Sequence, residues 1–284
     1  MSDLSEKEKL MYRIMGAVAN SGVPLIYKGA MVTKLFLLEH KFSAFSRETQ
    51  DIDASWAGNR LPTMETLTVA LNKALAPLAM KAIVKREYGD KKSAGFNVVY
   101  QNSGELVVSV DIDMRSEKGG RTYQYGDITF LGATVDHILS DKIYILSTEK
   151  AYRRAKDAID VYALSHCVEV RARSILSIWK EYGRTPGTFE AFTSRRADLE
   201  NAYLKLQRVE PKPDFSVVFS RLRLFLALFV EMSIKNLKWD NNKQLWNEPP
   251  SLLLRLDANK AKVECEKVLS DKTLVKSKDG QDIH

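Results

Sequence analysis

The sequence lacks the features that mark secreted, membrane-spanning and disulfide-built proteins. Its 284 residues include only two cysteines, Cys167 and Cys265, and their spacing forms neither a metal motif nor a disulfide framework. The first ten residues are charged and polar, unlike a signal peptide. The longest apolar stretch, residues 222–232, contains Arg223 and Glu231 and is too short to cross a bilayer. We therefore expect a cytoplasmic protein in a reducing compartment, with no membrane partner.

Motifs for several common enzyme chemistries are missing as well. The chain contains no CxxC, no HExxH and no nucleophile elbow, which argues against redox, zinc-protease and serine-hydrolase activity. The four histidines, His40, His137, His166 and His284, are scattered and are expected to be structural or exposed. Neither an internal repeat nor a low-complexity tract is evident.

The composition is that of a globular protein with a basic surplus. With 45% hydrophobic residues, the chain can bury one large core or two modest ones. The net charge is +7, and most of it lies from Ala151 onward, where 24 Lys and Arg stand against 18 Asp and Glu. A basic face suits a polyanion such as RNA, or an acidic protein, although a solvated helical surface gives the same excess.

Strand signals dominate the first half of the chain and helical periodicity the second. Ser5 and Glu8 form a capping box at the start of a helix that ends near Gly22. We expect strands over 23–26, 51–56, 82–88, 96–100 and 106–114, a further edge strand over 121–130, and helices over 31–39, 63–80, 135–147, 152–166 and 168–182. Turns are expected at 89–92 and 102–104. The pattern predicts an α+β domain over 1–131 and an all-helical domain over 132–284.

The organising stretch is Tyr27-Lys28-Gly29-Ala30, which follows an apolar run and precedes a helical pattern. This order indicates a strand, a glycine turn and a helix. Backbone N–H groups at the start of such a helix are free to bind a phosphate.

A pair of carboxylates follows about twenty residues later. Asp51 and Asp53 flank Ile52 in a predicted strand, so both point to the same face, about 7 Å apart. Mg²⁺ takes hard oxygen ligands, usually one or two carboxylates together with phosphate oxygens and water. The glycine turn and this pair together describe a site for a metal-bound nucleoside triphosphate.

A site with two metal ions needs a third carboxylate from a neighbouring strand. The run Val108 to Asp113 supplies Asp111 or Asp113, which again share one face, and spacing does not choose between them. Strand-end acids that merely face solvent are the alternative. The second Asp-x-Asp pair makes the combination more selective than either pair alone.

The helical half adds a basic group of residues. Lys142 follows Asp141 within an apolar helix, and Asp157 and Asp160 are three residues apart in the next one, so they are neighbours on its surface. Arg154 and Lys156 precede them. A lysine near a triphosphate neutralises charge that develops on the leaving phosphates, whereas ordinary ion pairs on a solvated helix face would look the same.

These motifs, in this order, resemble the AbiEii/AbiGii toxin family. The resemblance rests on Lys28-Gly29, on Arg47 leading to the Asp51 pair, on Asp141-Lys142, and on the run from Arg154 to Asp160. It covers about residues 25–164. It implies a nucleotidyltransferase of the DNA polymerase β-like fold, with a mixed sheet flanked by helices. Such proteins are toxins of bacterial toxin–antitoxin and phage-defence systems, paired with an antitoxin, and some add nucleotides to the 3′ end of tRNA.

The resemblance also implies roles for individual residues. Lys28, Gly29 and Ala30 would hold the nucleotide phosphates, with Arg154 and Lys156 in support. Asp51 and Asp53 would bind catalytic Mg²⁺ or Mn²⁺. The third acid of the strand pattern above, Asp111 or Asp113, is expected to join them, with Asp111 as a metal ligand, and to take the proton of the acceptor hydroxyl as general base. Lys142 would contact the triphosphate and Asp157 would complete the site.

One position departs from the family pattern. A second glycine or a serine usually follows the first glycine, and this chain has Ala30, which keeps the N–H donor but loses the hydroxyl. Thr33 or Ser46 is available to supply a hydroxyl instead.

The leading hypothesis is a metal-dependent transfer of NMP from an NTP to an RNA end. Transfer to an antibiotic or to a protein hydroxyl is a second possibility. A module that only holds nucleotide or RNA is a third.

Overall fold

The structure, a computed structural model, describes residues 4–88, 93–114, 119–230 and 237–247. The turn expected at 89–92, Cys265, His284 and the polar tail after residue 272 lie outside these ranges.

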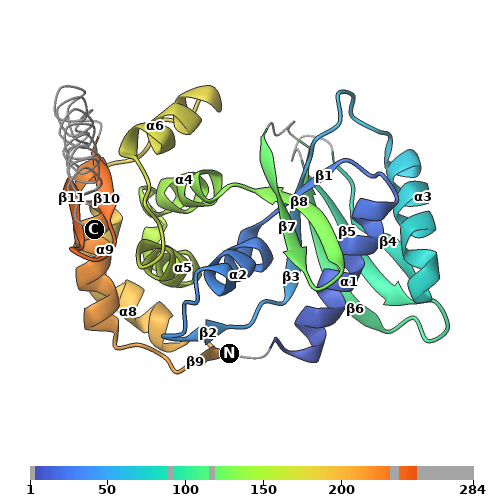
Figure 1. Ribbon diagram of the computed structural model, residues 1–284, viewed down its shortest axis with the longest axis horizontal. Helices are drawn as coiled ribbons and strands as arrows, with labels where there is room; N and C mark the ends of the chain where they lie inside the picture. Colours follow the sequence, from blue (N-terminus) through green and yellow to red (C-terminus); the bar gives the residue numbers. More distant parts are fainter. Residues whose placement is uncertain (1–3, 89–92, 115–118, 231–236, 248–284) are drawn as a thin grey trace, which may run out of the picture.

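A seven-stranded mixed sheet forms the centre of the N-terminal part (Figure 1). Its order is β4-β5-β6-β3-β1-β8-β7. The strands are β1 (Leu25–Lys28), β3 (Asp51–Trp56), β4 (Met80–Arg86), β5 (Ser93–Tyr100), β6 (Leu106–Asp113), β7 (Gly120–Tyr125) and β8 (Ile128–Ala133). The β1–β8 and β3–β6 pairs are parallel and the other pairs are antiparallel. The mixed sheet confirms the predicted α+β class.

Helices cover both faces of this sheet. On one side lie α1 (Glu6–Asn20) and α3 (Met64–Leu75), with a 3₁₀ turn at Ala76–Leu78 that contains Pro77, and on the other lies α2 (Gly29–Glu39) (Figure 1). The capping box at the start of α1 is present, with Ser5 and Glu8 bonded reciprocally. The strand, turn and helix order from Leu25 to Glu39 is also confirmed.

The expected edge strand over 121–130 is wrong in one respect, because the segment is a hairpin. β7 and β8 pair antiparallel and are joined by Gly126 and Asp127, with Gly126 at a φ of 60°. A two-residue turn with positive φ at its first position suits glycine and reverses the chain. The run therefore gives two strands, and β8 reaches inward to pair with β1.

The second part of the chain is mainly helical but not all-helical as predicted. Its helices are α4 (Val135–Leu146), α5 (Ala155–Ser165), α6 (Ala172–Glu181), α7 (Glu190–Ser194), α8 (Arg196–Leu204) and α9 (Phe215–Val230), with a 3₁₀ turn at Ala151–Arg153. Three short strands accompany them, β9 (Val209–Glu210), β10 (Lys238–Asp240) and β11 (Leu245–Asn247). Strands of two or three residues are too short to show the alternation by which strands are predicted.

The two parts share one connected hydrophobic core. The helix α2 packs on β1 and β3 and also against α4 and α5. The short strand β2 (Ser46–Arg47) pairs with β9 from the helical part. The division at residue 131 therefore stays a prediction, since the packing runs across it. Among the described residues, no helix has both the length and the apolar character that a membrane span requires.

Candidate active site

A cavity of about 530 Å³ lies where the sheet, α2, α4 and α5 meet. Nine of the residues predicted for the site line it: Lys28, Gly29, Ala30, Asp51, Asp53, Lys142, Arg154, Lys156 and Asp157. Asp111, Asp113 and Thr33 do not line it. Residues from both halves of the chain therefore converge on one space, as the proposed chemistry requires.

A row of cross-strand partners runs across the sheet beside this cavity. Arg86 on β4 stands opposite Gly95 on β5, and Gly95 stands opposite Asp111 on β6. Asp111 in turn is in register with Asp53 on β3, which is opposite Lys28 on β1. Because cross-strand partners share a face, the two carboxylates are direct neighbours between two cations.

Asp53 is an acid whose charged form is disfavoured by its surroundings. Burial raises its pKa to about 6, and the nearby Asp51 carboxylate adds to the shift, while Lys28 partly offsets it. Asp51, one step along the same face, is exposed. A carboxylate that is both desolvated and close to another carboxylate favours a proton or a cation beside it.

Gly29 is required where it stands. Its φ is +70°, a region that suits glycine, and a Cβ built there would clash with Asp53 Oδ2. The absence of a side chain therefore brings the first turn of α2 directly against the carboxylate. This contact explains why the sequence places a glycine at the end of β1.

Asp111 is the acid held next to Asp53. The Arg86 guanidinium forms an ion pair with it, reaching past Gly95, whose missing side chain leaves the path across β5 open. The Asp111 side chain stays 39% exposed, so it is accessible to a ligand at the edge of the cavity.

Asp113 and Thr33 have other contacts. The Nζ of Lys28 lies 3.5 Å from Asp113 Oδ2, so this lysine links β1 to β6. The hydroxyl of Thr33 donates to the carbonyl of Gly29 at 2.8 Å and is buried. Thr33 lines a smaller neighbouring pocket of about 30 Å³, and its hydroxyl is thus occupied within α2.

Two helices begin at the cavity without a side-chain cap. Lys28 is the N-cap residue of α2 and Arg154 that of α5, and neither end has a capping hydrogen bond from a side chain. Unpaired N–H groups and the positive end of the helix dipole face an anion at such a start. Since the N-cap residues themselves are basic, both ends suit the oxygens of a polyphosphate.

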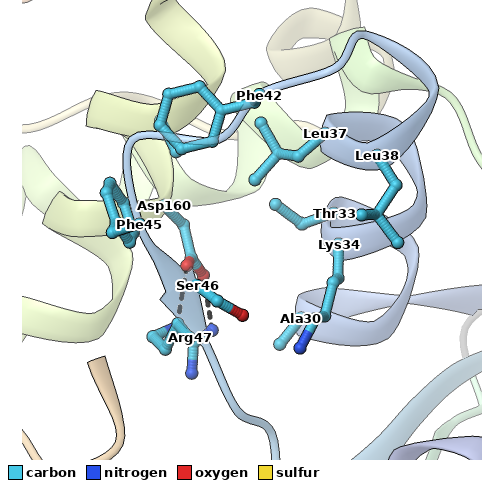
Figure 2. Close-up of a pocket in the computed structure, with 11 residues that line it drawn as sticks. Ala30, Thr33, Lys34, Leu37, Leu38, Phe42, Phe45, Ser46, Arg47 and Asp160 are labelled. Atoms are coloured by element: carbon cyan, nitrogen blue, oxygen red, sulfur yellow. Dashed lines mark hydrogen bonds and ion pairs between the residues drawn. The ribbon is translucent and has the colours of Figure 1, made fainter. Parts of the chain in front are cut away.

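Opposite the sheet, the buried Lys142 is fixed by Asp160. Its Nζ lies 2.7 Å from Asp160 Oδ2 and 3.3 Å from Asp157 Oδ1. Arg47 donates to the same Asp160 carboxylate through Nε at 2.9 Å and Nη2 at 2.8 Å (Figure 2). We call Arg47, Lys142, Asp157 and Asp160 the buried ion cluster.

Charge pairing outweighs burial in this cluster. Burial acts to lower the pKa of Lys142, but Asp160 and Asp157 raise it above its ordinary value. Burial likewise acts to raise the pKa of Asp160, but Arg47 and Lys142 hold it below its ordinary value. Lys142 and Asp160 therefore remain charged, and Lys142 keeps its positive charge at the cavity wall.

Among the residues of the cavity wall that were not predicted site residues are Asp141 and Arg184. They form an ion pair, with Asp141 on α4 and Arg184 just after α6. In the sequence, Gly183, Pro186 and Gly187 mark a break in the helical pattern beside Arg184, but nothing in the spacing places that loop over α4. Arg47 was noticed only as part of a motif, and its pairing with Asp160 joins residues 113 apart.

The donor set fits a divalent cation shared with a nucleotide rather than a closed metal site. Among the described residues no group of three or more His, Cys, Asp or Glu side chains converges to hold a metal ion. Asp51 and Asp53 nevertheless offer carboxylate oxygens on one face, and burial, with the nearby Asp51 carboxylate, raises the pKa of Asp53. Mg²⁺ commonly binds through one or two carboxylates plus substrate phosphates.

Comparison with known proteins gives one family. The model of the family described as "Nucleotidyl transferase AbiEii toxin, Type IV TA system" matches residues 25–231, which include the sheet, the cavity and most of the helical part. None of the curated protein sequences matches the chain.

Solved structures agree on the fold. MenT4, nucleotidyltransferase toxin Rv2826c from Mycobacterium tuberculosis H37Rv, superposes with a TM-score of 0.53 at 12% identity, over 84% of this chain and 86% of that chain. An antigenic nucleotidyltransferase-like protein from Paracoccidioides brasiliensis covers 76% of this chain and 98% of its own, at 14% identity and a TM-score of 0.43. At these identities the first likeness shows a shared fold alone, and the second is too distant to support an argument.

Proposed function

The chain belongs to the AbiEii family of nucleotidyltransferase toxins of type IV toxin–antitoxin systems, and from this premise we propose that it transfers NMP from an NTP to the 3′ end of a tRNA. One observation carries the proposal. Asp51 and Asp53 share a single cavity with Lys142 and with the uncapped starts of α2 and α5. The family implies a cognate antitoxin, which this chain's own residues do not identify.

The triphosphate would bind between the two helix starts. The N–H groups that follow Lys28 and Arg154 would donate to its oxygens, and Lys142 would offset the charge of the departing phosphates. Because Asp160 already fixes the Lys142 ammonium at 2.7 Å, the lysine does not need to reorganise when the nucleotide arrives. Such preorganised charge is effective in stabilising a transition state.

The carboxylates of the sheet would hold a divalent cation, Mg²⁺ or Mn²⁺. Asp51 and Asp53 are the proposed ligands, with Asp111 as the third acid because it is the one in register beside Asp53. When bound, such a cation would lower the pKa of the acceptor hydroxyl and neutralise charge on the phosphates.

The reaction would exchange a phosphoanhydride bond of the NTP for a phosphodiester bond to the acceptor. The oxygen of the acceptor hydroxyl forms a bond to the α-phosphorus, and the bond from that phosphorus to the bridging oxygen breaks. Asp111, partly exposed beside Asp53, would take the proton of the hydroxyl as general base. Pyrophosphate leaves with the electron pair of the broken bond, beside Lys142.

Exposed cations around the start of α5 support an RNA acceptor. Lys150, Arg153, Arg154 and Lys156 lie within seven residues of one another and are all exposed. Arg195 from the loop before α8 lies over the ring of Tyr152, 3.4 Å from its centroid. A group of cations at the cavity mouth would bind the phosphate backbone of an acceptor.

The test is transfer of label from each of four α-³²P-labelled NTPs to total tRNA, with Mg²⁺ present. We expect label in tRNA with the wild type and at least a thousandfold less with Asp53→Asn, as befits loss of a proposed metal ligand. Asp127→Asn is the matched control, since Asp127 is exposed in the β7–β8 turn, away from the cavity. Label on protein or on a small molecule instead of tRNA would overturn the acceptor. No transfer at all, from protein that binds NTP, would overturn the activity.

A further inference from the structure

One wall of the cavity differs from the rest in being apolar and aromatic. Along α4, Ile138, Lys142 and Ile145 follow one another at helical spacing, and all line the cavity together with Tyr144. Tyr144 is the one aromatic ring among the described residues that line this cavity. A triphosphate gains nothing from such a wall, whereas a nucleobase has flat apolar faces that stack on aromatic and guanidinium planes.

The position of Arg184 over this wall is set by the end of α6. Gly183 takes a φ of +60° and donates to the carbonyl of Lys180, and Arg184 donates to the carbonyl of Trp179. This pair of bonds is the Schellman arrangement, which ends a helix in a defined geometry. The indole of Trp179 in turn donates to the carbonyl of Ser140 on α4, so the turn is anchored to the helix that forms the wall.

The Arg184 side chain is held in place by several contacts. Its guanidinium lies 5.5 Å from the centroid of Tyr144 and 5.2 Å from that of Tyr182, and it pairs with Asp141. The side chain is nevertheless 19% exposed, and that of Asp141 is 39% exposed. Arg184 and Asp141 therefore present donors and an acceptor side by side next to the ring of Tyr144.

We infer that Arg184, Tyr144 and Asp141 form the nucleobase subsite of this cavity, with the base against Tyr144 and Arg184 and its polar edge beside Asp141. The inference rests on the proposed function, because it assigns the base of the same nucleotide whose phosphates face Lys142. A carboxylate accepts hydrogen bonds and donates none. The base edge beside Asp141 therefore carries a donor, such as the exocyclic amino group of cytosine or the N3–H of uracil.

A purely structural role for Arg184 makes different predictions. If the ion pair with Asp141 only ties α6 to α4, its loss weakens the fold and affects every ligand of the cavity alike. If Arg184 holds a base, a change that keeps its charge but removes its plane affects nucleotides alone. Arg184→Lys makes this change, because an ammonium still pairs with Asp141 but gives no flat surface.

The experiment compares two ligands by isothermal titration calorimetry, with Mg²⁺ in excess. One ligand is CTP and the other is inorganic tripolyphosphate, which has the phosphates but no base. For Arg184→Lys and for Tyr144→Ala we expect CTP to bind about tenfold more weakly, since stacking on one base is of this order, with tripolyphosphate affinity unchanged. Tyr144→Phe, which keeps the ring, is expected to bind CTP as the wild type does.

The controls separate this inference from the proposed function. Arg173→Lys makes the same exchange at an exposed position of α6 outside the cavity and is expected to change neither affinity. Equal weakening of CTP and tripolyphosphate, or no weakening of either, overturns the base subsite while leaving the phosphate site intact. A wild type that binds neither ligand overturns the proposed function itself.

Discussion

The sheet and the helices on the two sides of the cavity differ in how their charges are paired. On the sheet, four carboxylates, Asp51, Asp53, Asp111 and Asp113, are accompanied by two cations, Lys28 and Arg86. On the other side, the buried ion cluster on α4, α5 and β2 sets two cations against two carboxylates, linked by bonds of 2.7 to 3.3 Å. The sheet side therefore carries an excess of negative charge, and the helical side is balanced.

The pKa shifts express this difference. Burial raises the pKa of Asp53 to about 6, so this carboxylate is held at a free-energy cost that a bound cation would remove. In the cluster, the partners of Asp160 keep its pKa below the ordinary value. We infer that the protein's own residues balance the charges on the helical side, whereas a bound cation is needed to balance those on the sheet side. Each prediction below separates the two sides by a measurement.

The largest expected effect follows from removing a carboxylate of the buried ion cluster. Asp160→Asn leaves the buried Arg47 and Lys142 without their shared carboxylate, and loss of one partner of a buried pair costs about 3 kcal/mol. We expect the free energy of unfolding, measured in urea, to fall by this amount. Asp198→Asn is the control: its pair with Arg195 is exposed, at 47% and 45%, and is expected to contribute less than about 0.5 kcal/mol. Equal losses from the two changes would contradict the proposed difference.

The next effect is the pH dependence of the unbalanced side. Because the pKa of Asp53 is raised from an ordinary 3.8 to about 6, its contribution to stability is complete below pH 4 and is lost as pH rises through 6. Relative to Asp53→Asn, the wild type should therefore lose about 1–3 kcal/mol between pH 4 and pH 7, in EDTA. Urea unfolding of both proteins at several pH values measures this.

Asp160 has the opposite sign and serves as the internal reference. Its pKa is lowered, so its contribution is present above the ordinary pKa and is lost only on acidification below it. The stability difference between the wild type and Asp160→Asn should stay level from pH 5 to pH 7. If the stability difference between the wild type and Asp53→Asn also stays level with pH, the fold does not disfavour the charged form of Asp53.

A third effect tests the contact between Gly29 and Asp53. Gly29→Ala and Gly104→Ala both place a side chain at a φ of +70°, but an added Cβ meets Asp53 at residue 29 and nothing within 4 Å at residue 104. Both should lose about 1 kcal/mol of stability for the backbone conformation. Only Gly29→Ala should also slow nucleotidyl transfer, by about tenfold, because the carboxylate must move. Equal transfer rates in the two variants would remove Gly29 from the site.

The parts of the site that sequence reasoning found are those governed by short-range rules. The strand, turn and helix around Gly29 and the common face of Asp51 and Asp53 follow from periodicity along a few residues. The pairing of Arg47 with Asp160 joins β2 to α5 and depends on how the halves dock, which no local pattern encodes. Arg184 was missed for the same reason, although the glycine that ends α6 marked the turn that carries it.

The smallest expected effect concerns Ala30, where the family pattern has glycine or serine. Residue 30 is the second residue of α2 and lines the cavity, and its N–H rather than its side chain is the proposed donor to phosphate. Ala30→Ser restores the hydroxyl, keeps the N–H and costs little in helix propensity. We therefore expect less than about a threefold change in NTP affinity by calorimetry, about 0.6 kcal/mol. A tenfold gain would mean that a side-chain hydroxyl is a principal phosphate ligand. The wild-type phosphate site would then lack that hydroxyl.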